Sequence, residues 1–209
     1  MDRWLTSLNR ALATPLSLRT RLLALALLAP LALAAFAPLW TLEMVAPQYP
    51  KGLTLDIYPY TVEGDIQEVN TLNHYIGMAR IDRAALSDLD WLPFALGVAA
   101  LLLLRVAAIG DLRALVDLVA LYTYFGLFSF ARFAYTLYVF GHNLAPDAPF
   151  TVEPFTPVVF GTGQVANFTI TSLPSTGALA LSAIGIALVG MLLATAASAL
   201  RGTRLAPAA

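Results

Sequence analysis

Two histidines and two methionines lie between the apolar runs of the chain, and their side chains are the ones best suited to metal chemistry. His74 and His142 are the only histidines, one in each of two polar segments, and Met44 and Met78 both fall in the first of these segments. Imidazole together with thioether suits copper, and thioether in particular selects Cu(I). These four residues predict a copper site if the two segments fold together. The alternative is that the histidines hydrogen-bond to backbone and the methionines fill gaps in a core.

Other chemistries have less support in the sequence. Zinc would need carboxylates beside the two histidines, and the spacing of an EF-hand calcium loop is missing. The chain has no cysteine, which excludes disulfides, thiolate metal sites and thiol nucleophiles. Walker, Gly-x-Ser-x-Gly and His-Glu-x-x-His motifs are absent, as are paired haem-binding histidines within an apolar run. The sequence therefore predicts a non-enzymatic protein without catalytic residues or an organic cofactor.

Arg132 is a charge well inside an apolar run. Such a charge is costly in a membrane and is usually paired or functional. A structural role would extend its side chain toward the membrane surface, to pair with Glu43, Asp147 or Glu153. A functional role would be to bind an anionic ligand or a lipid headgroup.

The composition indicates a membrane protein. Apolar residues make up 59% of the chain and charged residues 12%, whereas a soluble domain averages about 45–50% and about 25%. The net charge of −1 gives no reason to expect a nucleic-acid partner. We therefore expect an all-α membrane protein with about four transmembrane helices and a small α+β cap.

Four apolar runs are long enough to cross a bilayer core of about 30 Å. The predicted layout is an N-terminus 1–21, a first span 22–40, a first long segment 41–90, a second span 91–109, a third span 115–140, a second long segment 141–175, a fourth span 176–200 and a tail 201–209. Pro30 and Pro38 can kink the first span. The small-x-small pattern at 35–37 leaves a cleaved signal peptide as the alternative to a retained span.

Basic residues predict the orientation. They gather before the first span, around the turn between the second and third spans, and after the fourth span: Arg3, Arg10, Arg19, Arg21, Arg105, Arg113, Arg201 and Arg204. The positive-inside rule then places both termini in the cytoplasm and both long segments outside. Trp40 and Trp91 fall at the same outer interface, as an aromatic belt predicts. In a bacterium this is the inner membrane, and the cap is periplasmic.

The first long segment has the pattern of a small folded unit. Alternating residues predict a strand over Leu53–Ile57, ended by Pro59. Asp65 has an acid three positions later, as at a helix N-terminus, and helical spacing extends over Asp65–Ile76 with Gly77 as C-cap. A second short helix is predicted over Arg83–Leu89. The segment is acidic, which indicates a solvated surface or attraction of cations.

The second long segment is rich in proline and glycine and cannot form a regular helix. Its apolar residues, among them Phe150, Phe155 and Phe160, predict that it packs against the first long segment. We therefore expect the two segments to form one cap.

Three stretches of the chain resemble a known family: Ala46–Leu53, Leu72–Met78 and Gly141–Pro149. It is a poorly characterised family of small bacterial membrane proteins associated with nitrous-oxide-reductase accessory genes and their copper chaperones. The resemblance implies that the first span is retained and that His74, Met78 and His142 belong to the family motifs. The chain lacks the cysteine of the lipoprotein-type copper chaperones, so it is not that chaperone itself.

The leading prediction is a non-enzymatic membrane accessory protein that binds or relays copper for a periplasmic respiratory enzyme of the nitrous-oxide-reductase type. Its partners would be the lipid bilayer and a periplasmic copper chaperone or respiratory enzyme. The alternative is a metal-free structural or assembly subunit of a membrane complex. A membrane enzyme or transporter has less support.

Overall fold

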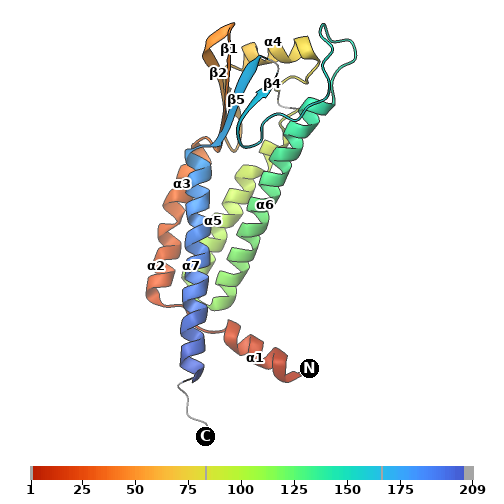
Figure 1. Cartoon of the computed structure of the whole chain (residues 1–209). Coiled ribbons are helices and arrows are strands. Elements are labelled where there is room, and N and C mark those ends of the chain that lie inside the picture. The colour runs from red at the N-terminus through yellow and green to blue at the C-terminus, as the bar shows by residue number, and fades with distance from the viewer. Residues whose placement is uncertain (1, 83, 166, 205–209) are drawn as a thin grey trace. The chain divides into compact units, whose positions relative to one another are not determined.

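The computed structural model describes residues 2–82, 84–165 and 167–204 (Figure 1). The chain divides into two compact units. The helix unit comprises Met1–Ala32, Ala95–Gly126 and Ala180–Ala209, and the sheet unit comprises Leu33–Phe94 and Leu127–Leu179. Several long helices contribute residues to both units.

Four helical stretches of the described chain are long and apolar enough to cross a membrane. They are Leu18–Phe36, which contains α2 (Leu18–Ala26) and α3 (Leu28–Phe36), then α5 (Leu92–Ile109), α6 (Leu112–His142) and the Thr176–Ser198 part of α7 (Thr176–Arg204). This confirms the four helices of the predicted fold class and fits a multi-pass membrane protein. Residues 205–209 of the predicted tail lie outside the described residues.

The first membrane helix is interrupted at Leu27, between α2 and α3. Pro30 has no N–H to donate to the carbonyl of Ala26, so the helical ladder loses one bond at this place. The helix ends at Phe36, whereas the sequence pattern predicted a span up to Trp40. Trp40 is instead the first residue of a strand, because its side chain joins the core of the sheet.

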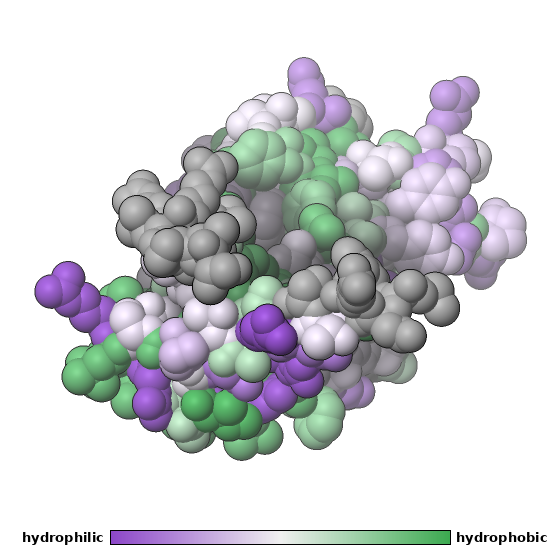
Figure 2. All heavy atoms as spheres, turned by 90° about the horizontal axis from the view of Figure 1, so that it is seen from below, coloured by the Kyte–Doolittle hydropathy of each residue, from purple (hydrophilic) through white to green (hydrophobic). Residues whose placement is uncertain are grey.

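The core of the helix unit is aliphatic. Its largest buried side chains come from α5, α6 and α7: Leu103, Val106, Leu115, Leu118, Ile184 and Leu188. Large apolar side chains are also exposed on these helices, among them Leu101, Ile186 and Leu193. Outward-facing apolar residues are what lipid contact requires. Hydrophilic and hydrophobic side chains are interspersed on the surface seen from below in Figure 2.

The α5–α6 turn is held by Arg21 of α2. Its Nε donates to the carbonyl of Ala107 at 2.7 Å and its Nη2 to that of Ala108 at 3.0 Å. A guanidinium at this place satisfies carbonyls at the end of α5 that have no partner within the helix. Gly110 follows in a left-handed conformation with φ +70°, where a Cβ would lie 2.9 Å from the Arg21 side chain.

The sheet unit contains a five-stranded antiparallel sheet with the strand order β3-β2-β1-β5-β4. The strands are β1 (Trp40–Ala46), β2 (Tyr49–Ile57), β3 (Val62–Gly64), β4 (Gly161–Val165) and β5 (Phe168–Pro174). The first three strands come from the first long segment and the last two from the second. Pairing of β1 with β5 therefore joins the two segments, which confirms that they form one cap.

One face of the sheet is packed and the other is open. Leu42, Leu53, Leu55 and Val62 point to the packed face and are buried with Val69. Val69 belongs to α4 (Ile66–Ile76), so this helix covers that face. Burial alternates along β1 and β2, as expected for strands with one solvated face.

The predicted strand and long helix of the first segment are confirmed, with two corrections. Asp65 does not cap α4 with its side chain, because its carboxylate accepts the backbone N–H of Thr54 at 2.8 Å instead. The predicted helix over Arg83–Leu89 is wrong: a short 3₁₀ helix, η1, occupies Ser87–Asp90, and Arg83 lies outside the described residues.

Candidate functional site

His142 is the last residue of α6, and its ring orientation is fixed by its own helix. The ring stacks on Tyr138, with centroids 3.8 Å apart and an interplanar angle of 21°. Nδ1 lies 2.9 Å from the carbonyl oxygen of Tyr138. A carbonyl can only accept, so Nδ1 carries the proton and a neutral ring presents Nε2 as a lone-pair donor. The same Nδ1–H to carbonyl bond orients many metal-binding histidines.

His74 lies in the last turn of α4 and is exposed. The helix ends at Gly77, whose φ of +76° is the predicted left-handed C-cap. Met78 follows, half-buried, and donates its backbone N–H to the carbonyl of Asn73 at 2.9 Å. This turn folds the chain back beside the helix end, as a Schellman-type cap does.

The segments that carry the two histidines meet at this turn. Ala145 donates its backbone N–H to the carbonyl of Gly77 at 2.8 Å, and Phe150 donates to the carbonyl of Tyr75 at 2.9 Å. Gly77 and Ala145 each lie three residues beyond a histidine, His74 and His142. The structure therefore joins the two histidine-bearing stretches through backbone hydrogen bonds.

Met44 has a different environment. It lies on β1 and packs against the buried apolar cluster of the sheet that includes Leu42 and Leu53. This is the gap-filling role expected of a core methionine. In residues 2–82, 84–165 and 167–204, no group of three or more His, Asp or Glu side chains converges closely enough to hold a metal ion.

Arg132 lies on α6 with its guanidinium carbon 5.4 Å from the centre of the Tyr135 ring. This geometry is a cation–π contact. The expected pairing with Glu43, Asp147 or Glu153 stays a prediction.

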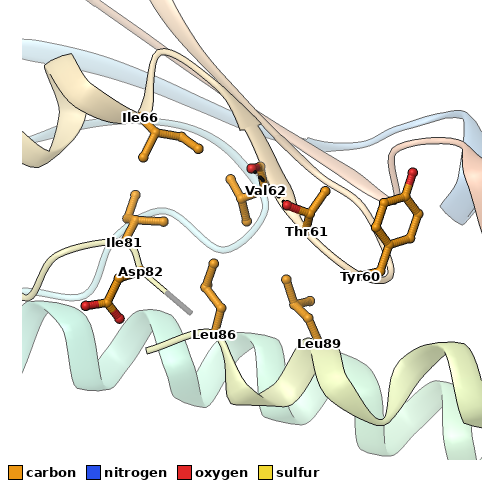
Figure 3. Close-up of a pocket in the computed structure, with 8 residues that line it drawn as sticks. All are labelled: Tyr60, Thr61, Val62, Ile66, Ile81, Asp82, Leu86 and Leu89. Atoms are coloured by element: carbon orange, nitrogen blue, oxygen red, sulfur yellow. Dashed lines mark hydrogen bonds between the residues drawn. The ribbon is translucent and has the colours of Figure 1, made fainter. Parts of the chain in front are cut away.

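A cavity of about 190 Å³ lies between β3, the start of α4 and the segment that leads to η1 (Figure 3). Its lining is mostly aliphatic: Val62, Ile66, Ile81, Leu86 and Leu89, with Tyr60, Thr61 and Asp82 also contributing. Figure 3 shows the side chains of Val62, Ile66, Leu86 and Leu89 gathered around the space.

The cavity is suited to an apolar group rather than to catalysis. Asp82 accepts the backbone N–H of Ala85 at 2.9 Å, so it has a structural role in its own turn. Sequence reasoning did not find the cavity. The only signal for it is the spacing of Ile81, Leu86 and Leu89 in an otherwise acidic stretch.

The open face of the sheet carries a row of polar side chains, with the exposed apolar side chains of Val45 and Leu173 on either side of it. Glu43 is exposed there, with Thr54 and Thr171 as its neighbours on the adjacent strands. Thr171 in turn lies beside Thr162 of the edge strand β4, with their hydroxyls 3.2 Å apart. Next to this row, Thr41 donates its hydroxyl to Asp56 at 2.6 Å. We call the row Thr162, Thr171, Glu43 and Thr54 the polar row.

Comparison of the chain with known protein families, curated proteins and solved structures finds no match. The resemblance noted from the sequence motifs therefore stays a prediction.

Proposed function

We propose that the chain is a non-enzymatic accessory subunit of a membrane complex and that its sheet is the platform on which a partner protein docks. The observation that carries the proposal is the continuity of sheet and membrane helices. Only three residues separate Phe36 of α3 from Trp40 of β1, and one residue separates Pro174 of β5 from Thr176 of α7. The sheet thus follows α3 and leads into α7 with only these short connections between them.

Backbone hydrogen bonds reinforce both junctions. Ser175 donates its N–H to the carbonyl of Leu39 at 2.9 Å, and Gly177 donates to that of Pro38 at 2.8 Å. Gly177 leaves no room for a side chain, since a Cβ would lie 2.9 Å from the Pro38 oxygen. Short connections that are hydrogen-bonded to each other favour an assembly role over that of a mobile carrier.

The polar row supports the same proposal. It runs across the open face from β2 to the edge strand β4, and its hydroxyls and one carboxylate offer hydrogen-bonding groups to a flat protein surface. Non-obligate protein interfaces are about as polar as the rest of a protein surface. The arginine distribution supports an orientation with both termini in the cytoplasm and the sheet in the periplasm of a bacterial inner membrane.

Copper binding is a second candidate because the Nε2 atom of His142 is left as a lone-pair donor. With His74 and Met78 it would supply two imidazoles and a thioether, a set that suits Cu(I). Met44 is a weaker candidate for a copper ligand than these three residues, because it packs in the core of the sheet. The partner in this case would be a copper chaperone or a nitrous-oxide-reductase type enzyme.

Copper titration separates the two candidates. The purified full-length chain in detergent is titrated with Cu(I) against a chromogenic chelator, and bound copper is measured by mass spectrometry. The assembly role predicts no stoichiometric binding. One equivalent of copper, lost in both His74→Ala and His142→Phe, would establish the copper role instead. His142→Phe is the sharper variant, because it keeps a ring to stack on Tyr138 and removes the ligand nitrogen.

A charge reversal tests the platform. Glu43→Lys should leave the chain inserted and folded but remove it from its high-mass complex on native gels of solubilised membranes. Glu68→Lys is the matched control, because Glu68 is an exposed acid on α4 and lies off the polar row. If the wild-type chain migrates only as a free protein, or if both reversals act equally, the platform proposal fails.

A further inference from the structure

The N-terminal helix α1 (Asp2–Leu12) precedes the first membrane helix and was not anticipated from the sequence pattern. Leu5, Leu8 and Leu12 recur at helical spacing and share one face. Thr6 and Arg10 occupy the opposite face. Leu5 is 45% exposed and Leu8 is 41% exposed, so this apolar face is open.

The chain between α1 and the first membrane helix is fixed to the α5–α6 turn. Leu16 donates its N–H to the carbonyl of Gly110 at 2.7 Å, and Leu112 donates to that of Thr14 at 2.9 Å. These two bonds flank a bridge between Pro15 and Asp111. Leu16 itself is buried in the core of the helix unit. The connection is therefore a short antiparallel pairing and not a free linker.

This anchoring keeps α1 close to the start of the first membrane helix. Ser17 is the N-cap of α2 and accepts the backbone N–H of Thr20 at 3.2 Å, so the membrane helix begins immediately after the joint. Arg113, at the start of α6, donates to the side-chain oxygen of Asn9 in α1 at 3.0 Å. In a bilayer crossed by these spans, a helix held this close to the ends of three of them would lie at the level of the lipid headgroups. Figure 1 shows α1 leading away from the foot of α2 rather than extending it.

Charge at this end of the helix unit favours an anionic surface. Arg10, Arg19 and Arg113 are exposed. Two acidic side chains nearby are already engaged: Asp111 accepts the N–H of Ala114 at 2.8 Å, and Asp117 pairs with Arg105 at 3.0 Å. The exposed guanidinium groups are thus suited to lipid phosphates, for which arginine has matching bidentate geometry.

We propose that α1 is an interfacial helix that binds the anionic lipid headgroups of the bilayer. Leu5 and Leu8 insert at the boundary between headgroups and acyl chains, and Arg10, Arg19 and Arg113 contact phosphates. Amphipathic helices with basic polar faces bind membranes in this way, through buried apolar area and attraction to anionic lipid. The helix then fixes the depth of the first span and the α5–α6 turn in the membrane.

Spin labels measure the depth of α1 directly, because the chain has no native cysteine to remove. Leu8→Cys and Thr6→Cys are labelled singly and reconstituted in nanodiscs of phosphatidylcholine and phosphatidylglycerol. We expect the label at position 8 to collide with oxygen and to be shielded from aqueous nickel chelate, and the label at position 6 to show the reverse. Leu5→Cys repeats the apolar-face measurement if Leu8→Cys folds poorly.

Two outcomes would contradict the proposed insertion of α1 into the bilayer. Both labels accessible to the nickel chelate would place α1 in water. A label at position 8 shielded from oxygen and nickel alike would mean that protein, such as a second copy of this chain, covers the face.

The lipid preference is tested by native mass spectrometry of the full-length chain with phosphatidylglycerol and with phosphatidylcholine. Replacing Arg10 and Arg19 by Gln should weaken retention of phosphatidylglycerol by about five-fold per arginine and leave phosphatidylcholine unchanged. Arg80→Gln, an exposed arginine of the sheet unit, is the matched control. Equal losses in the test and control variants, or equal losses of both lipids, would contradict headgroup binding by this surface.

Discussion

Trp40 donates its indole Nε1–H to the hydroxyl of Ser172, 2.8 Å away, and so links the first strand of the sheet to the strand that precedes the last membrane helix. Ser172 has no exposed surface, and its own hydroxyl donates to the carbonyl of Val159 at 3.0 Å. One buried hydroxyl therefore holds three stretches of chain together. The Trp40 ring also packs against Phe133, with centroids 5.1 Å apart.

Ser172→Ala should destabilise the cap. The substitution leaves the indole N–H of Trp40 and the carbonyl of Val159 without this partner, and a buried unsatisfied group costs about 1–3 kcal/mol. Thermal unfolding in detergent, followed by tryptophan fluorescence, measures the loss. Trp40→Phe with Ser172→Ala is the control, because the double variant should cost less than the sum of the two single variants. Fully additive losses would show that the hydrogen bond contributes little.

Gly77→Ala should separate the two histidine-bearing stretches. The new Cβ would lie 2.8 Å from the oxygen of Ala145 and 2.9 Å from its nitrogen, at a residue whose φ is +76°. Gly161→Ala is a matched control, since Gly161 has φ +92° but open space around it. Both variants bear backbone strain of about 1–2 kcal/mol, and only Gly77→Ala adds the clash.

Amide hydrogen exchange distinguishes the two glycine variants. Gly77→Ala should raise exchange at Ala145 and Phe150, whose N–H groups bond to the end of α4. Gly161→Ala should leave those amides protected. Unchanged protection at both amides in Gly77→Ala would mean that the second segment is held mainly by the β1–β5 pairing.

The sequence was sufficient to predict the elements that have a local sequence pattern. Alternation over Leu53–Ile57 predicted the C-terminal half of β2, and the position of Gly77 predicted the end of α4. In contrast, β1 was missed although Trp40, Leu42 and Met44 alternate with Thr41 and Glu43. This alternation follows directly on the apolar run of the first span, and the predicted span extended to Trp40.

The proline and glycine content of the second segment hid β4 and β5. Pro174 stands at the end of β5, where a strand tolerates it, and Gly161 and Gly163 lie on the edge strand β4. The sequence pattern also could not predict the orientation of individual side chains. The orientation of the His142 ring depends on Tyr138 and its carbonyl, and no spacing rule encodes that stack.

Tyr58 makes the stability of the sheet unit dependent on pH in the alkaline range. Partial burial raises the pKa of its phenol above 10.0, and the nearby charges of Glu63 and Asp56 raise it further. A raised pKa means that the folded chain favours the protonated phenol, so the stability contribution is complete below the ordinary value and is lost as pH rises through the folded pKa. Tyr58→Phe should therefore unfold less readily than wild type above about pH 10 and match it near neutrality.

Ultraviolet titration of the phenolate, taken as the difference between wild type and Tyr58→Phe, measures that pKa. Glu63→Gln should shift it part of the way back toward 10.0, because one of the neighbouring charges is removed. An unchanged pKa in Glu63→Gln would mean that the charge of Glu63 does not contribute to it.

Gly185 of α7 faces the ring of Tyr122 of α6 within the helix unit. A Cβ at Gly185 would lie 3.4 Å from the ring of Tyr122, whose hydroxyl donates to the carbonyl of Leu181 at 2.7 Å. Small residues at such a contact let membrane helices pack closely. Gly185→Leu should therefore push the ring away and break its hydrogen bond, whereas Gly185→Ala needs only a small adjustment.

Gly190 supplies the matched position on the same helix, because a Cβ there meets nothing within 4 Å. Gly190→Leu should be neutral or stabilising, since leucine favours helix over glycine by up to about 1 kcal/mol. We expect overpacking to cost Gly185→Leu about 1–3 kcal/mol, seen as a lower unfolding temperature in detergent. Tyr122→Ala in the Gly185→Leu background makes room for the new side chain and should recover part of the loss. Equal unfolding temperatures for Gly185→Leu and Gly190→Leu would show that this contact does not limit the packing of α6 and α7.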